Sequence, residues 1–219
     1  MLTYEELRRD ESIRTYITCA DTSLLKQGFT EHSFAHVGRV AEAAGEILSL
    51  LGYDAHDVEL ARIAGYLHDV GNLINRTDHS QSGALLAFRL LEERGMPAAD
   101  IATVITAIGN HDEGTGVPVN PVAAALILGD KTDVRRSRVR NAELSTFDIH
   151  DRVNYSVVRS SLQVNEARSV ISLYLDLDTS ISPVMDYFEI FLGRMIMCRK
   201  AAEALGCVFR LIINDQQLF

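Results

Sequence analysis

The hydrophobic pattern of this chain changes its period near residue 147, and this change limits the folds that are open to it. Before that point, apolar residues recur at three- and four-residue steps, as they do along one face of an α-helix. After it, the segment SVISLYLDLD alternates apolar and polar residues, which is typical of a strand with one buried face. We therefore predict a mainly α fold, with a helical domain over residues 1–147 and a small α+β unit over residues 148–219.

Glycines and prolines divide the first part into consecutive helices. The expected helices cover residues 32–51, 56–70, 79–94, from Pro97 to about 111, and from about 121 to 138, with one or two more before residue 28. Gly52, Gly71 and Gly95 follow the ends of the first three, where a left-handed residue ends a helix. The segment DEGTGVPVNP is predicted to be a loop.

Residues 148–219 are expected to form a β-β-α-β unit. The segments RVNYSVVRSSLQV and SVISLYLDLD are the first two strands, and NEAR joins them as a hairpin loop. An amphipathic helix from Ser182 to Gly206 and the strand CVFRLII complete the unit. Two roles stay open for its apolar residues, because they could form the core of the unit or the contact surface of a homodimer.

The composition excludes several classes of partner. The chain has 219 residues, a formal charge of −9 and a pI near 5.2, which opposes binding to a nucleic-acid backbone but still permits a basic pocket for a small phosphorylated substrate. No run approaches the 18 apolar residues of a membrane helix, and the charged N-terminus lacks the apolar core of a signal peptide. The three cysteines form no CxxC pair. We therefore expect a cytoplasmic protein with reduced thiols that binds neither nucleic acid nor membranes.

Several histidines fall at one end of the predicted bundle. A short connection joins the helix that ends with His68 and Asp69 to the helix that begins with His79, so these helices run antiparallel. His111 ends the following helix and returns to the same end. The helical pattern therefore gathers three imidazoles and a carboxylate in one region.

A metal site is the simplest cause for such a gathering, since buried charges without partners are costly. His36 and Asp130 complete the set if their helices reach the same level, which the pattern permits. Neutral imidazole and carboxylate oxygen suit zinc, iron or manganese, whereas calcium prefers oxygen alone. Asp69 would then bridge two ions, with His68 as a terminal ligand of one of them.

Three stretches resemble a known family. HVGRVA from His36, HDVGN from His68 and GDKTD from Asp130 are similar to the H…HD…D signature of the HD-domain superfamily of metal-dependent phosphohydrolases, over roughly residues 28–140. The resemblance implies an all-helical bundle of five core helices. In binuclear members it assigns six ligands to two ions, with the aspartate of the HD pair as the bridge: His36, His68, Asp69, His79, His111 and Asp130.

The resemblance leaves the reaction open. The set of four histidines and two aspartates looks like that of binuclear nucleotide hydrolases, including HD-type diadenosine tetraphosphate hydrolases, and also like that of diiron oxygenases of the myo-inositol oxygenase type. Asn72 departs from the cyclic di-GMP phosphodiesterases, which usually carry lysine at this position. We favour a hydrolase acting on a nucleotide or another small phosphate ester or anhydride. The diiron oxygenase and a metal-binding regulatory module are the alternatives.

The expected hydrolase mechanism uses the ions and a few side chains around them. Two metal ions activate a water molecule and clamp the phosphoryl oxygens, with Asp69 at the catalytic centre and His32 as a proton shuttle. Arg39, Lys131 and Arg135 are the candidate phosphate-binding cations, and the last two lie four residues apart on one face of the predicted helix. We expect two transition-metal ions, iron or manganese ahead of zinc, nickel, cobalt or magnesium.

Overall fold

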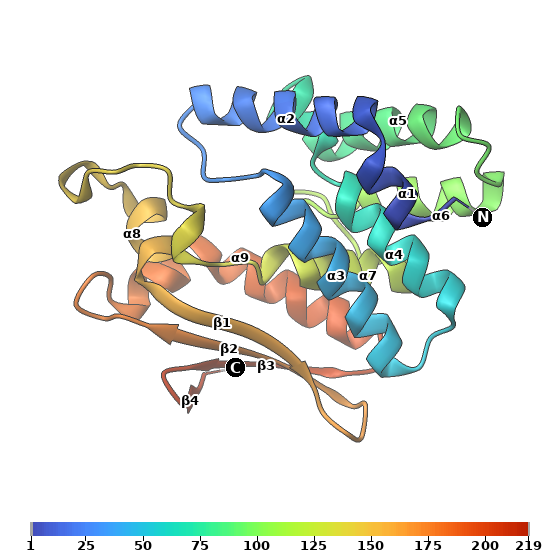
Figure 1. The fold of residues 1–219 in the computed structure, drawn as a ribbon. Helices are drawn as coiled ribbons and strands as arrows, with labels where there is room; N and C mark the ends of the chain where they lie inside the picture. Colours follow the sequence, from blue (N-terminus) through green and yellow to red (C-terminus); the bar gives the residue numbers. More distant parts are fainter. Residues whose placement is uncertain (1, 219) are drawn as a thin grey trace.

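This computed structural model describes residues 2–218 and shows a helical bundle with a four-stranded sheet against one side (Figure 1). The helical part consists of α1 (Tyr4–Arg9), α2 (Glu11–Lys26), α3 (Phe34–Leu51), α4 (Ala55–Leu67), the 3₁₀ helix η1 (Val70–Leu73), α5 (His79–Glu92), α6 (Ala98–Gly109) and α7 (Pro121–Lys131). The rest consists of the 3₁₀ helices η2 (Arg136–Arg138) and η3 (Leu144–Thr146), then α8 (Ile149–Ser156), β1 (Val157–Val164), β2 (Val170–Leu177), α9 (Val184–Ala204), β3 (Val208–Ile213) and β4 (Gln216–Gln217). The mainly α fold with a C-terminal α+β part is therefore confirmed.

Helix α7 is the centre of the molecule. Its sequence, PVAAALILGDK, is apolar on all sides until its last turn, as expected of a helix that is surrounded by others. Every residue from Val122 to Lys131 is buried, and α3, α4, α6 and α9 all pack against it. The charged pair Asp130–Lys131 at its end is therefore carried into the interior.

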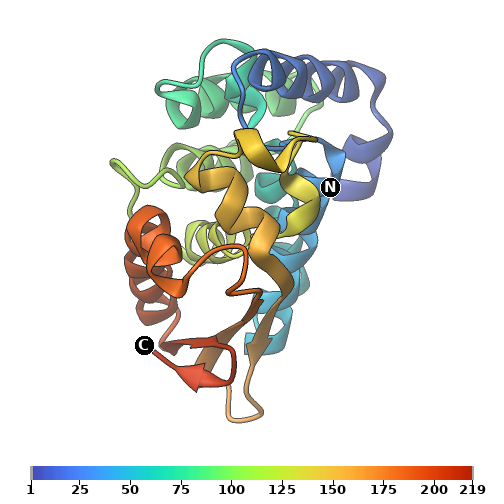
Figure 2. The ribbon, with the colours of Figure 1, turned by 90° about the vertical axis from the view of Figure 1, so that its left-hand side faces the viewer.

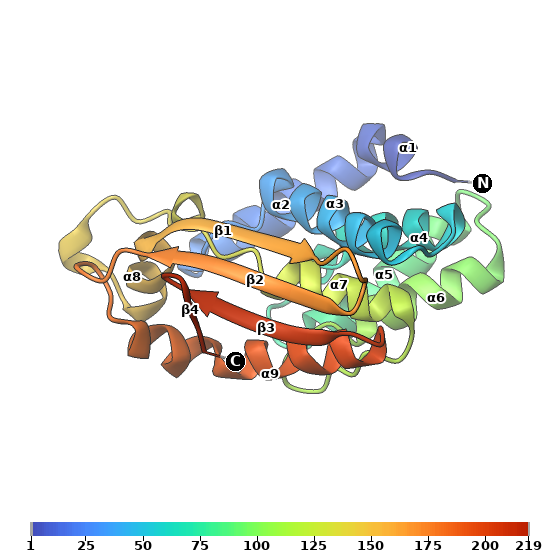
Figure 3. The ribbon, with the colours of Figure 1, turned by 90° about the horizontal axis from the view of Figure 1, so that it is seen from below.

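The sheet has the strand order β1-β2-β3-β4. β1 and β2 form an antiparallel hairpin, α9 crosses over to make β3 parallel to β2, and β4 is a short antiparallel addition. Ile171, Leu173, Leu175 and Leu177 of β2 are buried as their alternation predicted. Helix α9 runs along the sheet (Figure 3) and also packs on α7.

The layers follow from these contacts. Figure 2 shows α9 and the strands on the side of α7 that is opposite to α2 and α5. One continuous cluster of buried apolar residues extends from α1 to β3. The division into two domains near residue 147 stays a prediction.

Among the helices of residues 2–218, none is both long and apolar enough to cross a bilayer.

The structure differs from the expected elements in four places. The helix expected over residues 56–70 ends at Leu67, and Gly71 lies within the 3₁₀ helix η1 without a positive φ. Helix α7 ends at Lys131 instead of 138, because the next backbone N–H groups form tighter turns, from Asp133 to the Asp130 carbonyl at 3.2 Å and from Val134 to the Thr132 carbonyl at 2.9 Å, and the chain then becomes extended. Residues 152–156 belong to α8 instead of a strand, since the Asp148 side chain caps that helix. The sheet also gains β4, so the β-β-α-β unit has a further short strand.

Candidate metal centre

The first group of metal-binding side chains lies where α3, α4 and α7 meet. Nε2 of His36 lies 3.5 Å from Oδ2 of Asp69 and 3.5 Å from Oδ1 of Asp130. Nε2 of His68 lies 3.3 Å and 3.7 Å from the same two oxygens. All four residues are buried. Two nitrogens and two oxygens from three helices and the turn after α4 thus surround one point.

The second group shares Asp69 with the first. Nε2 of His79, at the start of α5, lies 3.2 Å from Nε2 of His111 and 3.6 Å from Oδ1 of Asp69. The ring of His111 also packs edge-to-face on His68, at 4.9 Å between centroids. Asp69 therefore presents Oδ2 to the first group and Oδ1 to the second. The structure brings together all six side chains that the sequence proposed.

Each of the four imidazoles is oriented by its outer nitrogen. In three of them Nδ1 donates to a backbone carbonyl, and in the fourth it faces a carboxylate: His68 to Gly65 at 2.8 Å, His79 to Arg76 at 3.1 Å, His111 to Ile108 at 2.6 Å, and His36 to Oδ2 of Asp133 at 2.8 Å. These partners assign the proton to Nδ1 and leave the lone pair of Nε2 directed inward. This is the orientation that metal-binding histidines take.

The inner atoms fit a cation. Nε2 of His36 and Oδ2 of Asp69 are buried and have no hydrogen-bond partner among the described residues. Such atoms are rare in folded proteins because each costs about 1–3 kcal/mol. A transition-metal ion that is bound by imidazole and carboxylate would satisfy both of them.

The charges of the centre also favour a cation. Burial is the largest single effect on the pKa of Asp69 and raises it, but the charge of His68 and the contacts with His36 and His68 together outweigh burial and hold this pKa well below its usual value. For Asp130, the charge of Lys131 and the contacts with His36 and His68 together outweigh burial in the same way. Burial alone would lower the pKa of His68, yet the two carboxylates raise it to about 10, so Nε2 holds a proton near pH 7 that a bound metal ion would displace. In contrast, burial and the neighbouring positive charges lower the pKa of His111 to about 3.

Gly71 allows the turn that carries the HD pair to lie directly on the start of α5. A Cβ atom at this position would lie 1.9 Å from the carbonyl oxygen of His79 and 2.5 Å from the nitrogen of Gly83. These are backbone atoms that cannot move aside, so any side chain at Gly71 would push η1 and α5 apart. The close approach is what brings Asp69 beside His79.

The other predicted site residues have different surroundings. The ring of His32 lies 5.4 Å from that of His36, and its Nδ1 bonds the Thr30 carbonyl at 2.7 Å. Burial lowers the pKa of His32 well below its usual value, so this ring is neutral near pH 7. Lys131 is buried, with Nζ 2.8 Å from Asp130 and 3.2 Å from Glu113.

The two candidate arginines lie outside this cluster. Arg135 is on no common helical face with Lys131, because α7 has already ended. It forms ion pairs with Glu31 at 2.6 Å and with Asp133 at 3.0 Å. Arg39 is exposed on α3, and it lines a groove to which none of the six clustered residues contributes.

The structure adds three residues that sequence reasoning missed. Asn72 donates to Oδ1 of Asp69 at 2.9 Å, and Asp133 fixes His36 as described above. Arg76 places NH1 3.3 Å from Oδ1 of Asn72 and 3.5 Å from Nε2 of His79, with no carboxylate in ion-pair range among the described residues. Asn72 and Asp133 each lie three residues after a predicted ligand, Asp69 and Asp130. This closeness in sequence was the signal that could have indicated them. No pattern marked Arg76.

Comparison with known proteins shows the family of this chain. A model of the HD domain matches residues 33–165. An uncharacterized protein of Methanocaldococcus jannaschii is 24% identical over 191 residues, which are 76% of this chain and 73% of that protein. Ribonuclease Y of Aliarcobacter butzleri is 31% identical over 125 residues, or 56% of this chain and 22% of that much longer protein.

Among solved structures, a predicted HD superfamily hydrolase from an uncultured Thermotogales bacterium matches with a TM-score of 0.46 and 28% identity. The match covers 62% of this chain and 75% of the other. The HD domain model, by contrast, covers more than half of the chain and includes five of the elements that build the metal centre. This chain therefore belongs to the HD domain family.

Proposed function

We propose that this protein is a metal-dependent phosphohydrolase with a binuclear centre. Membership of the HD domain family supports metal-dependent phosphoester chemistry in general. The observation that carries the binuclear proposal is the position of Asp69, whose Oδ2 faces His36 and His68 while its Oδ1 faces His79. One carboxylate between two sets of imidazole nitrogens has the form of a bridging ligand.

The six clustered side chains would hold the ions, and Asp69 would be shared between them. Two such ions supply Lewis acidity for activating water and for stabilising charge on a phosphoryl group. The protein groups around them keep the ligands fixed: Asn72 holds Oδ1 of Asp69, and Asp133 holds Nδ1 of His36. Lys131 balances the charge of Asp130 and is too deeply buried to reach a bulky substrate.

Arg76 is the residue that we assign to the substrate phosphate. Its guanidinium lies over the ring of Phe29, 5.6 Å from the centroid, and close to His79. Because no carboxylate among the described residues neutralises it, its charge remains available for a phosphate oxygen. His32 keeps the role of proton carrier, and Nε2 is the relevant atom since Nδ1 is bonded to Thr30.

The substrate that we propose is a small phosphate ester or anhydride, with nucleotides first. The net charge of −9 opposes long nucleic acids, and the local cations provide for one or a few phosphate groups. The similarity to ribonuclease Y makes short RNA a necessary member of any substrate panel. Iron and manganese suit the nitrogen and oxygen ligand set.

Hydrolysis with added Mn²⁺ or Fe²⁺, followed both as inorganic phosphate and as nucleotide or oligonucleotide products, tests this function. The panel contains nucleoside mono-, di- and triphosphates, a dinucleoside polyphosphate and short RNA. We expect metal-dependent hydrolysis of at least one of them, which His68→Ala abolishes. His150→Ala, at an exposed histidine on α8, is the matched control and should retain full activity. Substrate-dependent O₂ uptake by the iron-loaded protein, without hydrolysis, would contradict the proposal in favour of an oxygenase.

A further inference from the structure

A groove separate from the metal centre runs between α3 and β1. It encloses about 920 Å³, and residues 132–137 form its floor. The hydroxyl of Ser160 in β1 donates to the Thr132 carbonyl at 3.1 Å, which joins the floor to the strand. None of the six clustered residues of the metal centre lines it.

Arginines dominate the charge of this groove, although the chain as a whole is acidic. Five arginines line it, together with three acidic residues: Arg8, Arg39, Arg135, Arg136 and Arg159, with Glu42, Glu46 and Asp133. Arg8 is neutralised by Glu5 at 2.9 Å, and Arg135 is neutralised by Glu31 and Asp133. The exposed Arg159 lies 3.9 Å from Asp176.

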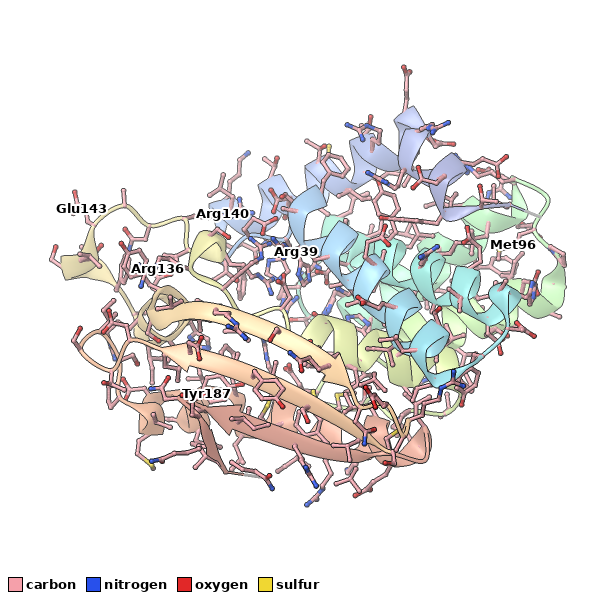
Figure 4. All side chains as sticks on the ribbon, turned by 60° about the horizontal axis from the view of Figure 1, so that its bottom comes forward. Arg39, Met96, Arg136, Arg140, Glu143 and Tyr187 are labelled. Atoms are coloured by element: carbon pink, nitrogen blue, oxygen red, sulfur yellow. The ribbon has the colours of Figure 1, made fainter. Side chains whose placement is uncertain are left out.

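Arg39 and Arg136 are different, because neither has a carboxylate within ion-pair distance among residues 2–218. Nε of Arg136 donates to the Tyr155 carbonyl at 2.6 Å, and its guanidinium lies 4.5 Å from the centroid of the Tyr155 ring. These two contacts fix the side chain while leaving its terminal nitrogens without an anion. Figure 4 shows Arg39 on α3 and Arg136 beside α8, near the start of β1.

The remaining surface of the groove also suits a polar ligand. Oγ of Ser161 is buried and lacks a hydrogen-bond partner among the described residues. Gly38 faces open space, since a Cβ atom there would have no atom within 4 Å. Of the acids on α3, Glu42 pairs with Arg62 at 3.7 Å, and Glu46 lies about 10 Å further along the helix axis than Arg39.

We propose that this groove is a second binding site, which takes a phosphate-bearing small molecule through Arg39 and Arg136. Guanidinium groups bind phosphate through paired charge-assisted hydrogen bonds. Two arginines without acidic partners therefore favour a ligand that offers phosphate oxygens to each of them. The volume is that of a small-molecule pocket and exceeds what inorganic phosphate fills, so the natural ligand is an organic phosphate.

The groove is next to the metal centre without being part of it. Asp133 lines the groove and also bonds Nδ1 of His36. A ligand in the groove is therefore separated from the first metal-binding group by one side chain. The binding site does not depend on the hydrolase proposal, because neither arginine contacts a metal-binding residue in the structure.

Calorimetric titration with methylenediphosphonate, which cannot be hydrolysed, tests the second site in the full-length, metal-loaded protein. We expect two equivalents of probe per wild-type chain and one equivalent for the double variant Arg39→Ala/Arg136→Ala. Both arginines are exposed, so the double variant should fold normally. The variant Arg76→Ala, at the metal centre, should keep the binding of probe in the groove, which the double variant loses.

Two results would overturn the second site. One is a single equivalent in both the wild type and the double variant, which would place all binding at the metal centre. The other is two equivalents in both proteins, which would exclude a role for these arginines. The double variant Arg9→Ala/Arg89→Ala removes two exposed arginines from outside the groove and should behave as the wild type. If it instead loses the same event, non-specific charge explains the binding and the proposal fails.

Discussion

Oδ2 of Asp133 lies 2.8 Å from Nδ1 of His36, so a carboxylate orients this ring, whereas backbone carbonyls orient His68, His79 and His111. Asp133 is itself held by Arg135 at 3.0 Å. Carboxylate partners of this kind fix the tautomer of a metal-binding histidine and make it a stronger ligand.

The substitution Asp133→Asn is expected to weaken metal binding about 10–100-fold, as removal of such outer partners does. The amide cannot accept the ring proton with the same charge, so His36 loses both orientation and basicity. Competition against a chelator measures the change. Asp215→Asn, in the turn between β3 and β4, is the control and should leave the affinity unchanged. Equal affinity in Asp133→Asn and wild type would show that this pair is not part of the metal centre.

Gly71→Ala is expected to destabilise the fold by about 3 kcal/mol, because the added Cβ would overlap two backbone atoms. Urea unfolding measures the loss. Gly193→Ala is the matched control, because its Cβ meets nothing within 4 Å in α9 and the helix gains stability from alanine. If both substitutions have the same effect, the close approach of η1 and α5 is not needed by the fold.

Arg76→Ala is expected to raise KM for the phosphate substrate about tenfold, which corresponds to one charge-assisted contact of about 1.4 kcal/mol. Metal content should not change, since the Arg76 carbonyl that orients His79 is retained in alanine and Asn72 keeps its own bond to Asp69. Steady-state kinetics together with elemental analysis separate the two effects, and Arg89→Ala on the exposed side of α5 is the control. An unchanged KM would remove Arg76 from substrate binding, and a loss of metal would give it a structural role instead.

Asp10 provides a pH test that is remote from the metal centre. It caps α2, and Arg94 also contacts it at 2.6 Å. Hydrogen bonds from Ser12 lead the causes that lower the pKa of Asp10 to about 2 in the folded chain, against 3.8 for the free side chain. The stabilisation is therefore present above pH 4 and is lost as the pH falls toward 2.

The substitution Asp10→Asn should cost about 1 kcal/mol near pH 6, because solvent screens this carboxylate, and the difference from wild type should shrink below pH 4. Urea unfolding at several pH values measures both quantities. Glu166→Gln, in the exposed loop between β1 and β2, is the control. A stability difference that stays constant between pH 6 and pH 3 would contradict the assignment of the low pKa.

Helical periodicity and short connections predicted that His68, Asp69, His79 and His111 meet at one end of the bundle, whereas His36 and Asp130 were assigned by the resemblance to the HD-domain signature. The sequence could not predict the end of α7, since the basic run after Lys131 continues a helical pattern while the tight turns at residues 130–134 and the Asp133–His36 contact direct the chain elsewhere. For the same reason it placed Arg135 on a helical face that does not exist. Arg76 lies in a turn without periodicity, so only the three-dimensional structure brings it to His79.

Elemental analysis of the purified protein tests the central claim most directly. If Asp69 bridges two groups of ligands, the wild type should contain two transition-metal ions per chain. The double variant His79→Ala/His111→Ala removes both nitrogens of the second group and should contain one. One ion per chain in both proteins, or none in either, would contradict the binuclear centre.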